Sequence, residues 1–240
     1  MQIDVQISEP SRLYVIGDIH GRADLLDRMI DAIARDLQSD PASNCLTVTL
    51  GDYVDRGPAS RDVINCLMQN PFPTPYIALK GNHEVLFEEF LANPSTGDQW
   101  GQWGGMETVH SYGVDPVPMM MGRGCEVTAR ALAAAIPPEH SGFLSTLRSS
   151  LTVGRYFLCH AGLRPGVALH LQEERDLLWI RAEFLGCKED FGKIIVHGHT
   201  PVEEPEVRRN RINIDTGAYI TGRLTCAVLE NERVRFLTAV

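Results

Sequence analysis

The sequence predicts an α/β fold in which two packed, mixed β-sheets are flanked by helices. Three observations support this prediction. The first part of the chain alternates short apolar runs with segments of helical periodicity, and the last part is rich in short β-forming runs separated by turns. The 240 residues are 44% hydrophobic, which is enough for a sizeable core. Because we find no linker and no repeat, we expect residues 1–240 to form a single domain.

The first part of the chain predicts a parallel sheet. The expected strands are Arg12–Ile16, Leu46–Leu50 and Tyr76–Leu79, and the expected helices are Ala23–Leu37, Ser60–Met68 and Glu84–Leu91. Strands that alternate with helices form parallel sheets with right-handed crossovers. Ligands bind such sheets at the carboxyl ends of the strands, so polar residues that follow these strands are candidates for a site.

Residues 93–124 are rich in glycine, proline and methionine and include Trp100 and Trp103. We expect an irregular excursion here, which either shapes a substrate groove or caps the core. Helices are expected near Glu126–Ile136 and Pro138–Leu147.

The remaining residues predict a second set of strands. Leu151–Val153 and Tyr156–Cys159 are expected to form a hairpin, Leu177–Phe184 a helix and Ile194–Val196 a strand. Three further segments are expected to be sequential antiparallel strands, namely Arg211–Ile214, Leu224–Leu229 and Val234–Leu237. Two sheets packed face to face, with helices outside, accommodate this number of strands.

The composition excludes several classes of protein. A net charge of −9 argues against nucleic acid as a partner. No apolar run approaches the roughly 18 residues that span a bilayer, and no signal peptide is recognisable, so we expect a cytoplasmic protein with no membrane partner. The six cysteines form no Cys-x-x-Cys pair, which favours reduced thiols over disulfides or a zinc ribbon. The P-loop motif is absent. The oligomeric state stays open, with a monomer favoured.

Five short segments combine aspartate, asparagine or histidine with glycine. They are Gly-Asp-Ile-His-Gly (17–21), Gly-Asp-Tyr-Val-Asp-Arg-Gly (51–57), Gly-Asn-His-Glu (81–84), His-Ala-Gly (160–162) and His-Gly-His-Thr (197–200). Each motif alone is weak, but most of them follow expected strands, so together they predict one dinuclear metal site. Two divalent cations can bind a phosphoryl group and activate water, which indicates phosphoester hydrolysis. In the last motif, spacing alone allows either His197 or His199 to be a ligand.

In order, these motifs resemble those of the calcineurin-like metallophosphoesterases, and more narrowly the bacterial and phage branch of the phosphoprotein (serine/threonine) phosphatase family. The resemblance implies a fold of two packed mixed sheets and two divalent ions, with manganese favoured over iron or zinc. It assigns Asp18, His20 and Asp52 to one ion. It assigns Asp52, Asn82, His160 and His199 to the other, and so favours His199 over His197.

The resemblance also implies a mechanism. A hydroxide that bridges the ions attacks phosphorus in line, and no phosphoenzyme forms. His83 protonates the leaving oxygen and is oriented by Asp55, while Arg56 and Arg181 bind phosphate oxygens. Residues 215–217 (Asp-Thr-Gly) are better explained by a β-turn than by a loop of the pocket.

Three functions remain to be compared. The sequence favours a phosphatase that removes phosphate from phosphoserine and phosphothreonine in proteins or peptides. The first alternative is a symmetrical dinucleoside tetraphosphate (Ap4A) hydrolase. Glu84, where that group tends to carry aspartate, and the intact Val-Asp-Arg-Gly argue against it. The second alternative is a non-catalytic phosphoprotein-binding module, which the complete set of expected site residues disfavours.

Overall fold

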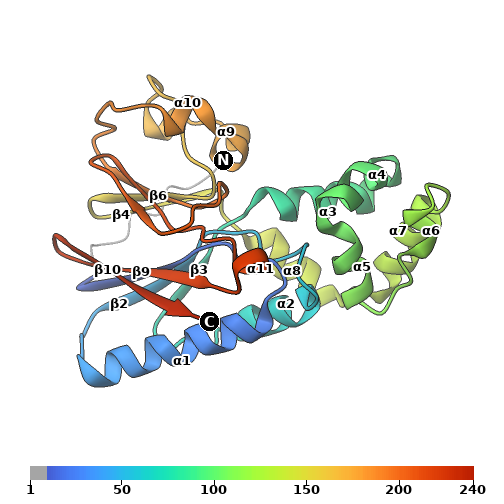
Figure 1. The fold of residues 1–240 in the computed structure, drawn as a ribbon, viewed down its shortest axis with the longest axis horizontal. Coiled ribbons are helices and arrows are strands. Elements are labelled where there is room, and N and C mark those ends of the chain that lie inside the picture. Colours follow the sequence, from blue (N-terminus) through green and yellow to red (C-terminus); the bar gives the residue numbers. More distant parts are fainter. Residues whose placement is uncertain (1–9) are drawn as a thin grey trace.

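A computed structural model describes residues 10–240 of the chain (Figure 1). One sheet contains β1 (Arg12–Ile16), β2 (Cys45–Thr49), β3 (Tyr76–Ala78), β9 (Leu224–Glu230) and β10 (Arg233–Ala239). The other sheet contains β4 (Ser150–Val153), β5 (Tyr156–Cys159), β6 (Ile194–His197), β7 (Glu206–Val207) and β8 (Arg211–Asn213). The strand orders are β10-β9-β1-β2-β3 and β4-β5-β6-β8-β7. The predicted architecture of two mixed sheets flanked by helices is confirmed.

The helices lie outside the two sheets and to one side of them (Figure 1). They are α1 (Ala23–Ser39), α2 (Ser60–Met68), α3 (Asn82–Ala92), α4 (Gly97–Trp100), α5 (Met106–Ser111), α6 (Val117–Met120), α7 (Cys125–Ala135), α8 (Pro138–Thr146), α9 (Glu174–Trp179), α10 (Ala182–Leu185) and α11 (Ala218–Thr221). Helix α1 runs beneath the first sheet, α9 and α10 cover the second sheet, and α3 to α7 form a lobe at one end (Figure 1).

The alternation of side chains along β1 explains the layers. Tyr14 and Ile16 belong to the apolar cluster that includes Leu26 of α1, whereas Leu13 and Val15 belong to the cluster that includes residues of both sheets. Successive side chains of a strand point to opposite faces, so β1 contributes to two cores at once. A third cluster packs the outer face of the second sheet against α9 and α10.

Most of the expected elements are present, and three expectations are wrong. Residues 93–124 are largely helical, because α4, a π-helical turn at Gly101–Gly105, α5 and α6 follow one another. The expected helix 177–184 is divided into α9 and α10, since Ile180 and Arg181 have non-helical backbone angles. Strand β8 does not pair with β9; it runs parallel to β6 in the other sheet. The expected antiparallel pair of β9 and β10 is confirmed.

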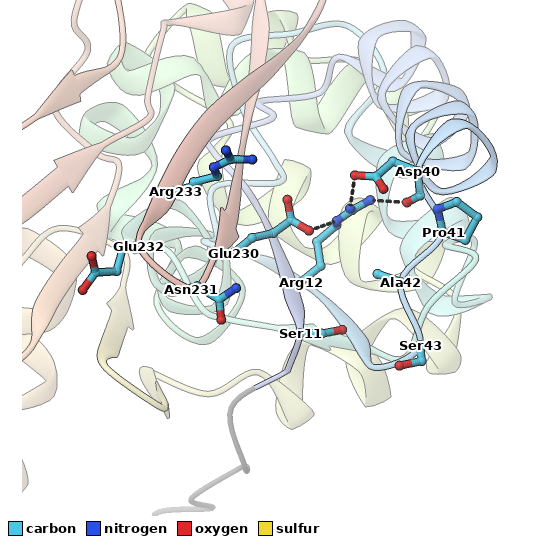
Figure 2. Close-up of a pocket in the computed structure, with 10 residues that line it drawn as sticks. All are labelled: Ser11, Arg12, Asp40, Pro41, Ala42, Ser43, Glu230, Asn231, Glu232 and Arg233. Atoms are coloured by element: carbon cyan, nitrogen blue, oxygen red, sulfur yellow. Dashed lines mark hydrogen bonds and ion pairs between the residues drawn. The ribbon is translucent and has the colours of Figure 1, made fainter.

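A surface hollow of about 630 Å³ lies at the start of β1, at the end of this strand opposite to the first motif (Figure 2). The buried side chain of Arg12 is one of the residues that line this hollow. It donates to Glu230 Oε1 at 2.6 Å, Asp40 Oδ2 at 2.6 Å and Asp36 Oδ2 at 3.2 Å. The three carboxylates satisfy its charge, so we interpret this hollow as a structural ion network that ties β1 to α1 and β9.

Within residues 10–240, no helix has the length and apolar character needed to cross a bilayer. All six cysteines are free thiols, and two of them, Cys159 and Cys226, are buried.

Candidate metal centre

The motif residues converge at the carboxyl ends of five strands. Asp18, Asp52 and Asn82 follow β1, β2 and β3, and His160 and His199 follow β5 and β6. The strands β1, β2 and β3 are mutually parallel, as are β5 and β6. The carboxyl ends of each parallel set therefore meet at one edge.

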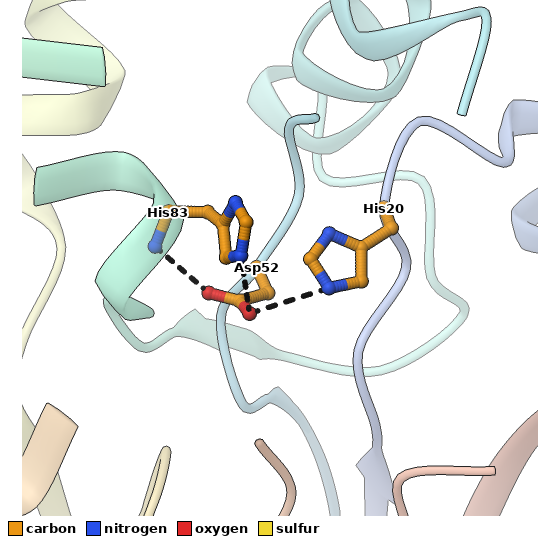
Figure 3. A group of neighbouring side chains, drawn as sticks. All are labelled: His20, Asp52 and His83. Atoms are coloured by element: carbon orange, nitrogen blue, oxygen red, sulfur yellow. Dashed lines mark hydrogen bonds and ion pairs between the residues drawn. The ribbon is translucent and has the colours of Figure 1, made fainter. Parts of the chain in front are cut away.

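The carboxylate of Asp52 lies between two histidines. Its Oδ2 is 3.4 Å from His20 Nε2, and its Oδ1 is 3.4 Å from His160 Nε2. Figure 3 shows the first of these contacts, together with His83, whose Nε2 lies 3.9 Å from Asp52 Oδ2. Two oxygens that face opposite imidazoles suit a carboxylate that bridges two cations.

The side chain of His160 faces a set of lone pairs. Its Nε2 is 2.9 Å from Asn82 Oδ1, 3.1 Å from His199 Nδ1 and 3.4 Å from Asp52 Oδ1. These atoms converge favourably only around a proton or a cation. The groups His20–Asp52–His83 and Asp52–His160–His199 each place their ligand atoms within 4.8 Å of one another.

The Nδ1 atoms of His20 and His160 donate hydrogen bonds to backbone carbonyls. His20 Nδ1 is 2.9 Å from the carbonyl of Val54, and His160 Nδ1 is 3.1 Å from the carbonyl of Leu50. A carbonyl accepts, so Nδ1 carries the proton and Nε2 is directed toward Asp52. Histidine ligands of metals are oriented in this way.

Two buried polar atoms of the site fit a cation. Within residues 10–240, Asp18 Oδ1 and His199 Nε2 have no hydrogen-bond partner. An unsatisfied buried carboxylate oxygen is costly, and a divalent ion would satisfy it. The donor set of carboxylate, amide oxygen and imidazole fits such ions.

The electrostatics of the site reflect buried charge. Burial, followed by the charge of Asp215, raises the pKa of Asp18. Burial lowers the pKa of His20 to about 3. It also opposes protonation of His160, but the carboxylates of Asp52 and Asp18 prevail and raise that pKa to about 9. A cation could take the place of this proton, because ligands must be deprotonated to bind metal.

Other predicted residues lie at the margin of the centre. Asp18 is outside both ligand groups, and its Oδ2 accepts from the backbone N–H of His199 at 3.0 Å. Arg181 is exposed at the start of α10, and its charge helps to lower the pKa of His199, after burial and His160. His197 is outside both groups as well. Its ring packs edge-on against the ring of Phe184, with the two centroids 5.0 Å apart, and its Nε2 lies 3.4 Å from Arg211 Nη1.

The predicted acid pair is assembled beside Asp52. His83 Nδ1 lies 2.7 Å from Asp55 Oδ2, and Arg56 Nη2 lies 3.0 Å from His83 Nε2. Burial opposes protonation of His83, but the charges of Asp52 and Asp55 raise its pKa. The contact with Arg56 is a hydrogen bond only while Nε2 carries no proton, so protonation of His83 requires the guanidinium to turn to another acceptor.

Glu84 is a buried residue of the site to which the sequence analysis assigned no role in it. Glu84 accepts from the backbone N–H groups of Asp52, Tyr53, Val54 and Gly81, at 2.7–3.3 Å. Burial, followed by the charge of Asp52, raises the pKa of Glu84 to about 7. The position of Glu84 in the third motif was a usable signal.

Asp215 does not lie in the expected β-turn, because residues 214–217 form an irregular segment between β8 and α11. It is buried, and its charge is the second cause, after burial, of the raised pKa of Asp18. Burial raises its own pKa to about 6. No local pattern distinguishes it from a turn aspartate.

The backbone of the site is strained. Positive φ angles occur at His20 (44°), Asp52 (52°), Asp55 (72°), Arg56 (68°) and His199 (65°), which are five of the seven such non-glycine residues in the described part of the chain. Strained residues persist only where surrounding structure fixes them, and they cluster at functional sites.

Comparison with known proteins finds a family model that covers most of the chain. Residues 11–235 match the family model of the calcineurin-like phosphoesterases. The chain is 25% identical to the asymmetrical bis(5'-nucleosyl)-tetraphosphatase PrpE of Anoxybacillus flavithermus over 230 residues, which cover 88% of this chain and 87% of that one. It is also 25% identical to serine/threonine-protein phosphatase 2 of Escherichia coli over 221 residues, with 89% and 90% coverage.

Solved structures share the fold at low identity. A cold-active protein-tyrosine phosphatase of a Shewanella species has a TM-score of 0.63 at 13% identity, covering 100% of this chain and 83% of that one. A protein serine/threonine phosphatase of Saccharomyces cerevisiae has a TM-score of 0.58 at 15% identity, with 98% and 82% coverage. The family match spans nearly the whole chain and all five motifs, and the chain therefore belongs to the calcineurin-like phosphoesterases, a family of phosphoester hydrolases.

Proposed function

We propose that this protein is a metal-dependent phosphatase that hydrolyses phosphoserine and phosphothreonine esters in proteins or peptides. The observation that supports it best is the acid pair of His83 and Asp55, buried beside the carboxylate of Asp52 and next to the guanidinium of Arg56. This arrangement supplies a proton donor and a phosphate-binding cation in one place.

Two divalent ions complete the proposed site. Asp18, His20 and Asp52 would hold one, and Asp52 with Asn82, His160 and His199 would hold the other. We propose manganese, with iron and zinc as alternatives. When bound, such ions lower the pKa of a coordinated water and offset the charge of the phosphate.

Side chains of this protein would bind the phosphate and transfer the proton. Arg56 and Arg181 would bind phosphate oxygens, and the turn of Arg56 toward phosphate would release His83 Nε2. The ester oxygen leaves phosphorus with the electron pair of the broken bond and takes the proton of His83 Nε2, while an oxygen of water becomes bonded to phosphorus. A proton released from that water restores His83.

A second candidate substrate is a dinucleoside polyphosphate, and one observation favours it. The ring centroids of Trp103 and Trp179 lie 6.0 Å apart, and the ring centroid of Trp179 lies 6.4 Å from that of His199. The two tryptophans line a hollow of about 560 Å³, in which Trp103 is 37% exposed. Exposed tryptophan rings are suitable platforms for nucleobases.

A direct comparison of substrates separates the two candidates. With manganese present, we expect kcat/KM for a phosphothreonine peptide to exceed that for diadenosine tetraphosphate. The opposite preference would overturn the proposed substrate. In that case Trp103→Ala should weaken transition-state binding of the nucleotide by about 1–3 kcal/mol, because base stacking is worth that much, and should leave the peptide unaffected.

Two variants test whether the chain is a catalyst at all. Asp52→Asn removes the bridging charge and His83→Asn removes the acid. We expect each to reduce kcat by at least about 100-fold, the lower range for general acid catalysis. Unchanged phosphatase activity in both variants would contradict the mechanism, and a manganese-loaded wild type without phosphatase activity would favour a binding module.

A further inference from the structure

The helical segment 93–124 contacts Asp55, far from it in sequence, through two side chains. Trp100 Nε1 donates to Asp55 Oδ2 at 2.8 Å, and Thr108 Oγ1 donates to Asp55 Oδ1 at 2.6 Å. All three side chains are buried. The carboxylate is thus bonded through both oxygens, and Oδ2 is shared with His83 Nδ1 at 2.7 Å.

The same segment also binds the backbone of the motif. The N–H of Asp55 donates to Thr108 Oγ1 at 2.8 Å, and the N–H of Arg56 donates to the carbonyl of Gly104 at 3.0 Å. Asp55 and Arg56 have φ angles of 72° and 68°. Such a conformation persists only where neighbouring contacts fix it, and the segment supplies several of them.

The orientation of His83 depends on this arrangement. A carboxylate bonded at one oxygen can rotate, but Trp100 and Thr108 act on opposite oxygens of Asp55. Fixing the carboxylate fixes the acceptor of His83 Nδ1, and with it the direction of Nε2. A buried carboxylate also stays favourable as an anion only when donors replace water.

We propose that Trp100 and Thr108 are positioning residues, which hold Asp55 and thereby aim the His83 imidazole at the leaving oxygen. Segment 93–124 is then part of the catalytic apparatus rather than a cap on the core. This proposal rests on the proposed function, in which His83 is the general acid.

The choice of substrates provides the test. Leaving groups differ in their need for an acid: p-nitrophenolate departs without much help, whereas the alkoxide of phosphothreonine does not. We expect Trp100→Phe and Thr108→Val to reduce kcat for a phosphothreonine peptide by about tenfold or more, a fraction of the 10²–10⁴ that general acids contribute. The same variants should reduce kcat for p-nitrophenyl phosphate less than threefold, on the order of 0.6 kcal/mol, and leave KM unchanged for both. Thr108→Ser, which keeps the hydroxyl, should restore activity.

Matched controls separate positioning from packing. Thr128 is a buried threonine of α7 whose hydroxyl has no partner within residues 10–240, so Thr128→Val should leave kcat unchanged for both substrates. Phe90 packs on Trp100 with ring centroids 4.7 Å apart, so Phe90→Leu disturbs the same packing without removing a bond to Asp55. We expect Phe90→Leu to leave the ratio of the two kcat values at that of the wild type.

Three outcomes would overturn the proposal. One is a reduction of kcat in Thr108→Val that is equal for both substrates. Another is a lower kcat in the double variant of Asp55→Asn and Thr108→Val than in Asp55→Asn alone, because a residue that acts through Asp55 should have no effect once Asp55 is changed. The third is an equal loss on both substrates in His83→Asn, which would remove the acid role itself and so overturn the proposed mechanism too. A strong substrate dependence in His83→Asn with none in Thr108→Val would overturn the positioning role alone.

Discussion

At the scale of single residues, glycine decides how closely two motifs approach each other. A Cβ atom on Gly198 would lie 2.0 Å from Asp18 Oδ1, and one on Gly81 would lie 2.1 Å from Asp52 Oδ1. Neither carboxylate can move freely, because each accepts a backbone hydrogen bond, from His199 and His83 respectively. The glycines of the motifs therefore leave room for these two carboxylates, which we predict to be metal ligands.

Gly198→Ala should displace the carboxylate of Asp18. We expect a destabilisation of about 1–3 kcal/mol, as for other overpacked sites, and a loss of bound metal measured by elemental analysis. Gly142→Ala is the control: this glycine lies inside α8 with no atom within 4 Å of the added Cβ, and the change should stabilise the helix by about 0.5–1 kcal/mol. Full metal content in Gly198→Ala would contradict this interpretation of the site.

His199 and His197 differ in their surroundings although they are two residues apart. His199 faces His160, whereas His197 packs against Phe184. We expect His199→Gln to weaken metal binding by at least about tenfold, since even outer partners of metal ligands are worth 10–100-fold. His197→Gln should keep the metal affinity of the wild type. Calorimetric titration with manganese compares the two, and the reverse result would exchange their roles.

At the scale of elements, α1 is joined to the first sheet by the carboxylate of Asp36. It accepts from Tyr14 Oη at 2.6 Å and from both terminal nitrogens of Arg235 at 2.6 and 2.7 Å. Burial opposes its ionisation, but the bonds from Arg235 and Tyr14 hold the pKa of Asp36 below its ordinary value of 3.8. The folded state therefore binds a proton at Asp36 less readily than the unfolded state does.

This difference gives a prediction for acid stability. The contribution of Asp36 is present above about pH 4, the pKa of the unfolded state, and is lost as the pH falls through the lower pKa of the folded state. Asp36→Asn should lower the free energy of unfolding by about 1.5–3 kcal/mol at pH 7. Below pH 4, the difference in this free energy between the variant and the wild type should become smaller. Urea unfolding at several pH values measures this difference. Asp31→Asn, at an exposed position of α1, should show no such narrowing.

The elements of the α3 to α7 lobe show where sequence patterns fail. The expected irregular stretch 93–124 is a series of short helices that turn at glycines and prolines. Glycine and proline lower helix propensity in any local window, but burial of Trp100, Val109 and Met119 in the main apolar cluster overrides it. The sequence pattern also failed to predict which sheet contains β8. A local pattern identifies a strand but not the sheet to which it belongs.

At the scale of the whole molecule, two sheets contribute ionisable residues to one buried centre. Asp18 and Asp52 come from the first sheet, and His160 and His199 from the second. Buried carboxylates repel each other, and a cation shared between the sheets would offset this repulsion. Metal binding should therefore link the two sheets energetically.

Removal of metal should lower the thermal stability of the protein. A ligand at 100 times its Kd stabilises the folded state by about 2.7 kcal/mol, which corresponds to roughly 5–11 °C for a chain of this size. Thermal scans before and after chelation, with manganese added back, measure the shift. Asp52→Asn should show a much smaller shift, and equal melting temperatures of the loaded and chelated wild type would contradict the metal centre.

The sequence by itself determined the fold class, the strands that carry the first three motifs, and the identity of the chemical groups. These features are local: strands such as β1 and helices such as α2 follow from periodicity over a few residues, and the five motifs name their own side chains. The roles of the individual motif residues stay predictions until the variants are measured.

Only the tertiary structure decided which residues surround those motifs. Trp100 and Thr108 reach Asp55 across 45 and 53 residues of sequence, and Asp215 approaches Asp18 from the loop after β8. The physical reason is that such contacts depend on how helices and sheets pack, whereas a sequence pattern records only what neighbouring residues share.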